Sequence, residues 1–242
     1  EESDNIVFFG GAGVSTESGI PDFRSKDGLY NQHDIQFDKY TPEYLLSRDC
    51  LFNNSKVFYE FYKQKLDVRE CEPNITHKVL AKLEQLGKVK AIVTQNIDGL
   101  HQKAGSIVVD EIHGTIAKNY CHQCKKVYDS NYIFNCNENV PKCECGGLIR
   151  PDITLYGESL PWNTVECANF AINNAELLIV GGTSLSVYPA ATYVQDFCGQ
   201  HLVVINKEPV NIPMDENNDL FIKSSLGDVF GKIDSWINTT KS

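Results

Sequence analysis

Short apolar runs alternate with longer amphipathic segments along most of the chain. Five runs have the length and composition of buried strands, and they cover residues 6–9, 89–94, 107–111, 177–180 and 202–206. Apolar residues recur at helical spacing in four segments, 74–86, 161–175, 190–197 and 226–237. Strands that alternate with helices predict a doubly wound, Rossmann-like α/β fold. In such a fold a parallel sheet is covered on both faces and binds ligands at the carboxyl ends of its strands.

Two stretches interrupt this alternation. Residues 26 to about 72 contain no convincing strand, but Thr41-Pro42-Glu43 predicts a helix start and residues 57–62 form an aromatic-rich helical segment. Residues 116 to about 150 contain a pattern of cysteines. We therefore expect a parallel-sheet domain with two small additions, a helical lobe and an inserted zinc-binding lobe.

The composition is that of a soluble globular protein, with 42% hydrophobic and 22% charged residues. A net charge of −10 argues against a general nucleic-acid binder, because such proteins need a cationic face for phosphates. No apolar stretch approaches the roughly 18 residues needed to cross a bilayer, and no secretory signal is visible. We therefore expect a cytoplasmic protein that binds neither nucleic acid nor membranes directly.

The strongest metal signal lies in four of the nine cysteines. They form two close pairs separated by eighteen residues, Cys121 with Cys124 and Cys143 with Cys145. Such pairs predict a tetrahedral zinc site with four thiolate ligands, although Cys136 and His122 are rival ligands. Because four thiolates leave no position for an activated water, the zinc should be structural. A zinc-ribbon interaction module is the alternative, but it would not explain the motifs elsewhere.

A glycine turn follows the first predicted strand. Gly11-Ala12-Gly13 stands where a dinucleotide-binding fingerprint begins, but Thr16 occupies the place of its third glycine. No Gly-Lys-Ser/Thr sequence follows, so a Walker A loop is also incomplete. The turn therefore completes neither of these two phosphate-binding motifs. A rigid polar segment, residues 20–24, follows it.

Polar residues also follow other predicted strands. Residues 95–99, Gln-Asn-Ile-Asp-Gly, offer amide and carboxylate groups for ribose hydroxyls and a carboxamide, although an Asx turn before a helix is an equal alternative. His113 ends the run that begins at residue 107 and is a candidate general base, against the alternative of a structural histidine. Residues 181–184 are small and would allow close approach of an anion.

Together these segments resemble the sirtuins, the NAD-dependent protein-lysine deacylases, over essentially the whole chain, and in particular their compact bacterial type. The matching motifs are the two cysteine pairs and residues 11–15, 19–24, 94–98, 113–114, 150–152, 156–161, 182–190, 205–206 and 227–228. The resemblance implies that residues 1–242 form a single catalytic domain, with the helical lobe at about 26–72 and the zinc lobe at about 116–150.

The resemblance assigns most of these loops to NAD. The residues that would contact it are Ala12, Thr16, Phe23, Arg24, Gln95, Ile97, Asp98, His113, Thr183, Ser184, Asn206 and Asp228. Within this set, Ile97 and Asp98 would form the carboxamide pocket, and Gln95 would hold the nicotinamide ribose. The adenosine half would lie at Asn206 and Asp228.

The resemblance also implies catalytic and peptide-binding residues. His113 would be the general base for a ribose hydroxyl, and Asn96 would position the ribose or a bound water. The peptide would enter as an added strand held by main-chain hydrogen bonds. Its contacts would be Gly157 and Glu158 on one side, and Ser186 and Val187 on the other.

The implied reaction moves an acyl group from a lysine side chain of a protein or peptide to ADP-ribose and releases nicotinamide. NAD is consumed, and one zinc is structural. An NAD hydrolase or an ADP-ribosyltransferase on the same scaffold is the alternative, because any nucleophile can capture the sugar once nicotinamide leaves. A non-catalytic NAD-binding or zinc-ribbon interaction protein is disfavoured by the presence of both His113 and Asn96.

One difference from a variant of the family limits which acyl group the protein should prefer. Sirtuins that prefer acidic acyl groups carry Tyr-x-x-Arg in the helical lobe, whereas residues 59–62 here are Tyr-Glu-Phe-Tyr. A succinyl carboxylate buried there without a cation would pay an unshielded desolvation cost. We therefore expect a preference for acetyl or another neutral acyl group.

Overall fold

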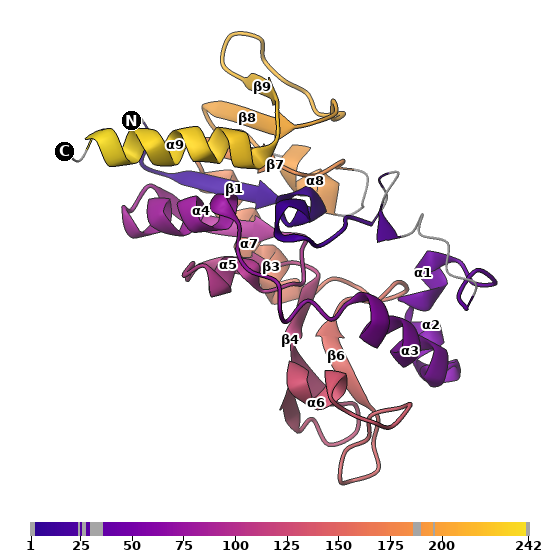
Figure 1. The fold of residues 1–242 in the computed structure, drawn as a ribbon. Helices are drawn as coiled ribbons and strands as arrows, with labels where there is room; N and C mark the ends of the chain where they lie inside the picture. The colour runs from indigo at the N-terminus through magenta and orange to yellow at the C-terminus, as the bar shows by residue number, and fades with distance from the viewer. Residues whose placement is uncertain are drawn as a thin grey trace.

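A central sheet of six parallel strands organises the molecule in the computed structural model, which describes residues 3–23, 25, 28–29, 36–185, 190–195 and 197–240. The spatial order of its strands is β3-β2-β1-β7-β8-β9 (Figure 1). Their bounds are Ile6–Gly10 for β1, Val89–Thr94 for β2, Val109–Glu111 for β3, Leu177–Gly181 for β7, His201–Asn206 for β8 and Leu220–Lys223 for β9. All neighbouring pairs run parallel, which confirms the predicted doubly wound fold.

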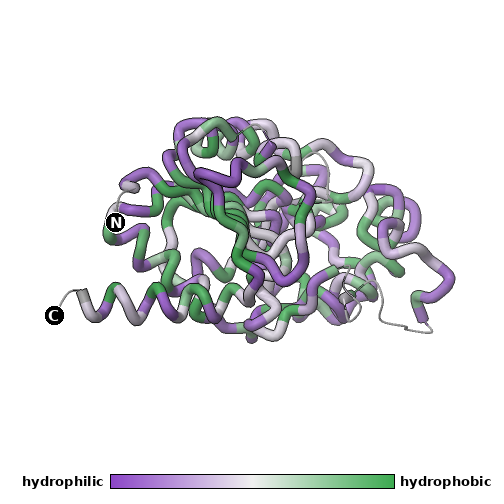
Figure 2. The backbone as a smooth tube through the Cα atoms, turned by 90° about the horizontal axis from the view of Figure 1, so that it is seen from above, coloured by the Kyte–Doolittle hydropathy of each residue, from purple (hydrophilic) through white to green (hydrophobic). Residues whose placement is uncertain are grey.

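Helices cover both faces of this sheet. On one face, α4 (Ile75–Gln85) and α9 (Leu226–Thr240) pack against Phe8, and on the other, α7 (Trp162–Asn174) and α8 (Ala190–Gln195) pack against Val7 and Phe9. Successive side chains of a strand point to opposite faces, so the continuous apolar run of β1 serves both cores. Figure 2 shows the hydrophobic strands stacked at the centre of the molecule. Among the described residues, no helix is both long enough and apolar enough to span a bilayer.

A second body lies beside the carboxyl ends of the strands (Figure 1). It consists of α1 (Pro42–Leu45), α2 (Arg48–Asn53), α3 (Ser55–Lys65), α6 (Ser130–Phe134) and an antiparallel sheet of β4 (Gly114–Cys121), β5 (Val127–Asp129) and β6 (Ile149–Ile153). Its helices and its sheet share one hydrophobic core. The Tyr59 hydroxyl donates to the carbonyl of Ile149, and Lys63 Nζ donates to the carbonyl of Cys136 over 2.8 Å. The exact limits of the two lobes, at 26–72 and 116–150, stay predictions.

Two differences from the predicted strands have a physical cause. The edge strand β9 was not expected, because it has only four residues and all of them are exposed or half-buried. The strand expected from residue 107 begins at Val109 instead. The N–H groups of Ile107 and Val108 donate to the Glu84 carboxylate over 2.9 and 2.7 Å, and these bonds hold the two residues outside the regular strand.

Two buried histidines meet beneath the sheet's carboxyl end. His77 of α4 and His101 of α5 (Leu100–Lys103) are 0% and 1% exposed, with ring centroids 4.7 Å apart. His77 Nδ1 accepts the N–H of Asn74 over 3.3 Å. Its Nε2 and both ring nitrogens of His101 have no hydrogen-bond partner in the described part of the chain. Burial lowers the pKa of His77 to about 4 and the pKa of His101 to about 3.

These histidines should make the fold sensitive to acid. An unfolded histidine takes up its proton near pH 6.5, whereas the folded pair stays neutral far below that pH. The pair's contribution to stability is therefore fully present above pH 6.5 and is lost as the pH falls toward 4. We expect the free energy of unfolding, from urea titrations, to fall by about 2 kcal/mol for each histidine between pH 7.5 and pH 5.

The variant His101→Phe isolates this effect from other titrating groups, because a phenyl ring suits a site whose neighbour, Phe8, lies 6.2 Å away. The pH-dependent loss should shrink by about 2 kcal/mol in this variant. Equal losses in wild type and His101→Phe would contradict the assignment.

Candidate active site

The glycine turn does not open a helix. After β1 the chain makes two 3₁₀ turns, η1 (Ala12–Val14) and η2 (Thr16–Ser18), and the Thr16 hydroxyl donates to the carbonyl of Gly13 over 3.0 Å. Gly13 N–H donates to the carbonyl of Gly182 over 2.8 Å, and a Cβ on Gly13 would lie 2.7 Å from Gly182 Cα. The glycines therefore allow the loops after β1 and β7 to touch. No third glycine is needed, because no α-helix begins here.

The segment after β2 faces this turn. Asn96 Nδ2 donates to Ser15 Oγ over 3.1 Å, and Ser15 Oγ donates to Asp98 Oδ2 over 2.7 Å. Asp98 Oδ1 also accepts the N–H of Leu100, so the Asx turn before α5 and the polar cluster are both present. Burial raises the pKa of the Asp98 carboxyl. Sequence reasoning missed Ser15 as a site residue, although it stood in a matched motif.

Gln95 connects the segment after β2 to the loop after β7. Its Oε1 accepts a hydrogen bond from Thr183 Oγ1 over 3.1 Å, and Thr183 is buried while Ser184 is exposed. Its Nε2 is buried and has no partner among the described residues. A buried amide donor without an acceptor is costly, so this atom is suited to an acceptor on a ligand.

His113 lies in the turn between β3 and β4, not at the end of a strand as expected. Its Nδ1 is 2.9 Å from the carbonyl oxygen of Gln95. A carbonyl oxygen only accepts, so Nδ1 carries the proton and Nε2 of the neutral ring is the basic atom. The backbone is held as well, because Thr154 N–H donates to the His113 carbonyl over 2.8 Å and Gly114 has a φ of +79°.

A cavity adjoins these groups. Its lining consists of Ala12, Ser15, Ile20, Pro21, Phe23, Leu29, Lys65, Leu66, Val68, Asn96, Ile97, Asp98 and Ile116. Most of these side chains are apolar, and the charged ones are Lys65 and Asp98. Tyr59 and Tyr62 do not line it, because both are fully buried in the core of the second body. The cavity thus contains Ala12, Phe23, Asn96, Ile97 and Asp98 of the predicted site.

The predicted adenosine residues lie at the far side of the sheet's carboxyl end. Asn206 ends β8, and its Nδ2 donates to the carbonyl of Glu208 over 2.8 Å. Asp228 is exposed in the first turn of α9, and its N–H donates to Ser225 Oγ over 3.2 Å. A Cβ on Gly227 would lie 2.3 Å from Glu17 Oε2 in η2, so the Glu17 side chain would have to move to admit one. Three predicted residues, Arg24, Ser186 and Val187, lie outside the described residues.

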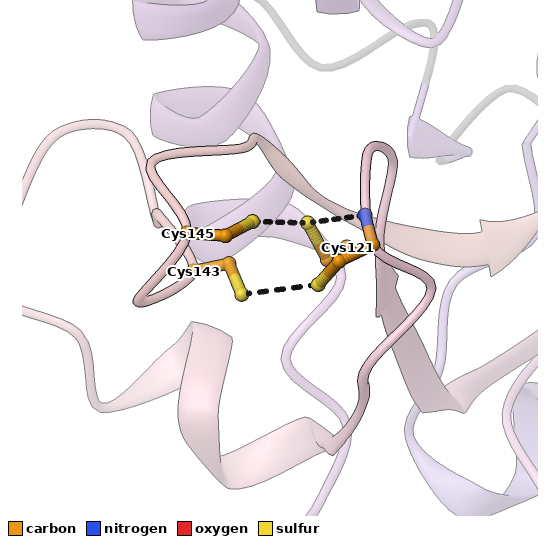
Figure 3. Close-up of side chains that lie close together, drawn as sticks. Cys121, Cys143 and Cys145 are labelled. Atoms are coloured by element: carbon orange, nitrogen blue, oxygen red, sulfur yellow. Dashed lines mark hydrogen bonds between the residues drawn. The ribbon is translucent and has the colours of Figure 1, made fainter.

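The four paired cysteines gather at one point. Their sulfurs lie within 4.8 Å of one another, and Figure 3 shows Cys121, Cys143 and Cys145 facing a common centre. The closest sulfur pairs are 3.5 and 3.6 Å apart. Four thiolates around one zinc would be about 3.8 Å apart, so the cluster fits the metal. Tyr128 Oη donates to Cys143 Sγ over 3.0 Å, a contact that the sequence did not suggest.

The rival ligands lie elsewhere. Cys136 follows α6, and neither it nor His122 belongs to the sulfur cluster of the described residues. The His122 ring instead packs edge-on against Phe52 of α2, with centroids 4.8 Å apart.

The predicted peptide segment follows β6 and comes before α7. Tyr156 N–H donates to the carbonyl of Leu46, and Arg48 N–H donates to the carbonyl of Tyr156, each over 3.0 Å. Gly157 follows with a φ of +87°, and Glu158 forms an ion pair with Arg150. Tyr156 forms a single β-bridge with Ser47, and the chain then turns, because Glu158 N–H donates to the carbonyl of Leu155 over 2.9 Å. The backbone of the segment is thus tied to the helical part of the second body.

Comparisons with known proteins agree with this geometry. The profile of the Sir2 family matches residues 11–189. An NAD-dependent protein deacetylase of Clostridium tetani is 50% identical over 96% of this chain and 93% of its own length, and one of Clostridium perfringens is 51% identical over 96% and 94%. A solved structure of Sir2 with a p53 peptide and NAD+ has a TM-score of 0.83 and 36% identity, over 98% of this chain and 95% of that one. The resemblance read from the motifs is confirmed, and the chain belongs to the Sir2 family, the sirtuins.

Proposed function

We propose that this protein is an NAD-dependent protein-lysine deacetylase that transfers the acyl group to ADP-ribose and releases nicotinamide. The observation that carries the proposal is the fixed tautomer of His113, whose Nδ1 is held by the carbonyl of Gln95, the residue directly before Asn96 of the cavity lining. Relatives about 50% identical over most of their length bear the name of this activity, which supports the proposal.

The residues present fit NAD. The buried Gln95 Nε2 has no acceptor among the described residues, and the touching loops after β1 and β7 bring backbone groups to the carboxyl ends of adjacent strands. Ala12, Thr16, Thr183 and Ser184 would hold the phosphates, with Phe23 and Arg24 over the nicotinamide ribose and phosphates. Bound there, NAD supplies an electrophilic sugar carbon with nicotinamide as its leaving group.

The chain's own groups then act by position and by proton transfer. Ser15 holds the Asp98 carboxyl and the Asn96 amide together, so both present a fixed orientation to the carboxamide and the ribose. The apolar lining excludes water that would otherwise capture the sugar. His113 Nε2 accepts the proton of a ribose hydroxyl, which makes that hydroxyl the nucleophile toward the acyl carbon.

The zinc is structural in this proposal. The donor set is four thiolates, Cys121, Cys124, Cys143 and Cys145, which closes the coordination shell. The substrates are acyl-lysine proteins or peptides, which would bind as a strand along Gly157 and Glu158, opposite Ser186 and Val187. A cytoplasmic location and the absence of nucleic-acid and membrane partners stay predictions.

The first prediction concerns His113. The variant His113→Ala should lower turnover by about 10²–10⁴-fold, because a positioned general base is lost. The measurement is nicotinamide release from NAD, with and without an acetyl-lysine peptide. Peptide-dependent release supports the deacetylase, peptide-independent release the hydrolase or ADP-ribosyltransferase, and no release a non-catalytic protein. Wild-type turnover in the variant would remove His113 from the mechanism.

The second prediction concerns the acyl group. Deacetylation should exceed desuccinylation by at least about tenfold, because a succinyl carboxylate would enter a mainly apolar cavity that already contains the Asp98 carboxyl. Initial rates on matched peptides that differ only in the acyl group provide the measurement. Faster desuccinylation would overturn the expectation and point to Lys65, the one cation of the described lining, which Lys65→Met would then test.

The third prediction concerns the metal ligands. Cys143→Ser should lose most of the bound zinc and melt at a lower temperature, because three thiolates hold zinc less tightly than four. Cys136→Ser should keep about one zinc per chain, since Cys136 lies outside the sulfur cluster. Atomic emission and thermal melts measure the two quantities. Zinc loss in Cys136→Ser would restore Cys136 as a ligand.

A further inference from the structure

The side chain of Glu158 points into the protein, although the family resemblance placed this residue among the peptide contacts. Its Oε1 lies 2.5 Å from Arg150 Nη1, and its Oε2 lies 2.9 Å from Arg150 Nη2. The two side chains are only 18% and 8% exposed. This is a bidentate pair, the geometry in which arginine binds a carboxylate most tightly.

The pair organises more than its own two charges. Glu158 Oε2 also accepts the N–H of Leu155 over 3.0 Å. Arg150 donates through Nε to the carbonyl of Pro151 over 3.2 Å and through Nη2 to the carbonyl of Ile153 over 2.9 Å. One guanidinium therefore connects the end of β6 with the loop that follows it.

Two residues inside this braced stretch are tied to other segments, and one of these ties reaches His113 of the site. Thr154 N–H donates to the carbonyl of His113, and Tyr156 exchanges backbone hydrogen bonds with Leu46 and Arg48. Burial is the largest single influence and would raise the pKa of the Glu158 carboxyl. The hydrogen bonds and charge of Arg150, the N–H of Leu155 and the charge of Arg48 together outweigh it and bring that pKa below its ordinary value. The carboxylate is therefore charged at neutral pH and stays paired.

We propose that Arg150 and Glu158 form a positioning brace that fixes the peptide-binding backbone at Gly157 relative to His113. The brace acts before substrate arrives, so the segment pays little ordering cost when a peptide adds to it as a strand. This inference rests on the proposed function, because it needs the peptide to bind along Gly157.

The test is a comparison of Michaelis constants. Glu158→Gln keeps the shape of the side chain and removes its charge. We expect its KM for an acetyl-lysine peptide to rise about tenfold, while its KM for NAD and its kcat change less than about twofold. Anisotropy of a labelled acetyl-lysine peptide should show the same weakening without turnover.

A second variant keeps the test valid if Glu158→Gln unfolds, since breaking a buried pair is destabilising. Arg150→Lys retains the charge but cannot reach both carboxylate oxygens and two carbonyls, so the peptide KM should rise by an intermediate factor. Lys118→Met is the control. It removes an exposed pair between β4 and β6, Lys118 with Asp152 over 3.0 Å, and should leave all constants unchanged.

The outcomes separate cleanly. A lower melting temperature with an unchanged peptide KM in both variants would show a purely structural pair and overturn the brace. A wild-type enzyme without peptide-dependent nicotinamide release would instead refute the proposed function, whatever the variants do.

Discussion

Close contact between two backbones, at Gly13 and Gly182, is the constraint on which the site depends. Gly182 has a φ of +60°, and a Cβ on it would lie 2.6 Å from Val14 N. Side chains at either position would separate the loops after β1 and β7. The contact fixes the start of η1, and Ser15 at its end then orients Asp98 and Asn96 by direct hydrogen bonds. Gly13 and Gly182 thus determine the positions of Asp98 and Asn96, which are far from both glycines in sequence.

The remaining parts of the site come from the second body. Its sheet strand β4 begins directly after His113, and its strand β6 continues into the segment of Tyr156 and Gly157. The helices and the metal-binding sheet share one core, so the four-cysteine cluster supports the site at a distance without touching it. This separation agrees with a closed, structural metal centre beside a site whose chemistry depends on an imidazole and an apolar cavity.

The sequence predicted the parts of the fold whose signal is local. Buried parallel strands appear as continuous apolar runs, and the cysteine pairs fix their own metal geometry by spacing. The edge strand β9 and the short strand β5 escaped prediction because their residues are exposed or half-buried, and β4 and β6 escaped because neither has a continuous apolar run. Ser15 and Tyr128 escaped for another reason, since the partners of each are assembled only by tertiary contacts. Glu158 was placed at the peptide site, but nothing local showed that Arg150 holds its carboxylate.

The acyl preference shows why a motif must be located before it is interpreted. The Tyr62 ring stacks between Phe58 and Phe134, with centroids 5.7 and 5.3 Å away, and its hydroxyl is fully buried. An arginine at position 62 would bury a guanidinium in an aromatic core. Packing alone therefore accounts for the tyrosine at position 62. The argument for a neutral acyl group therefore moves to the cavity itself. There a carboxylate would lie among mainly apolar side chains beside the Asp98 carboxyl, and Lys65 is the one cation of the described lining that could offset its desolvation, whatever residue stands at position 62.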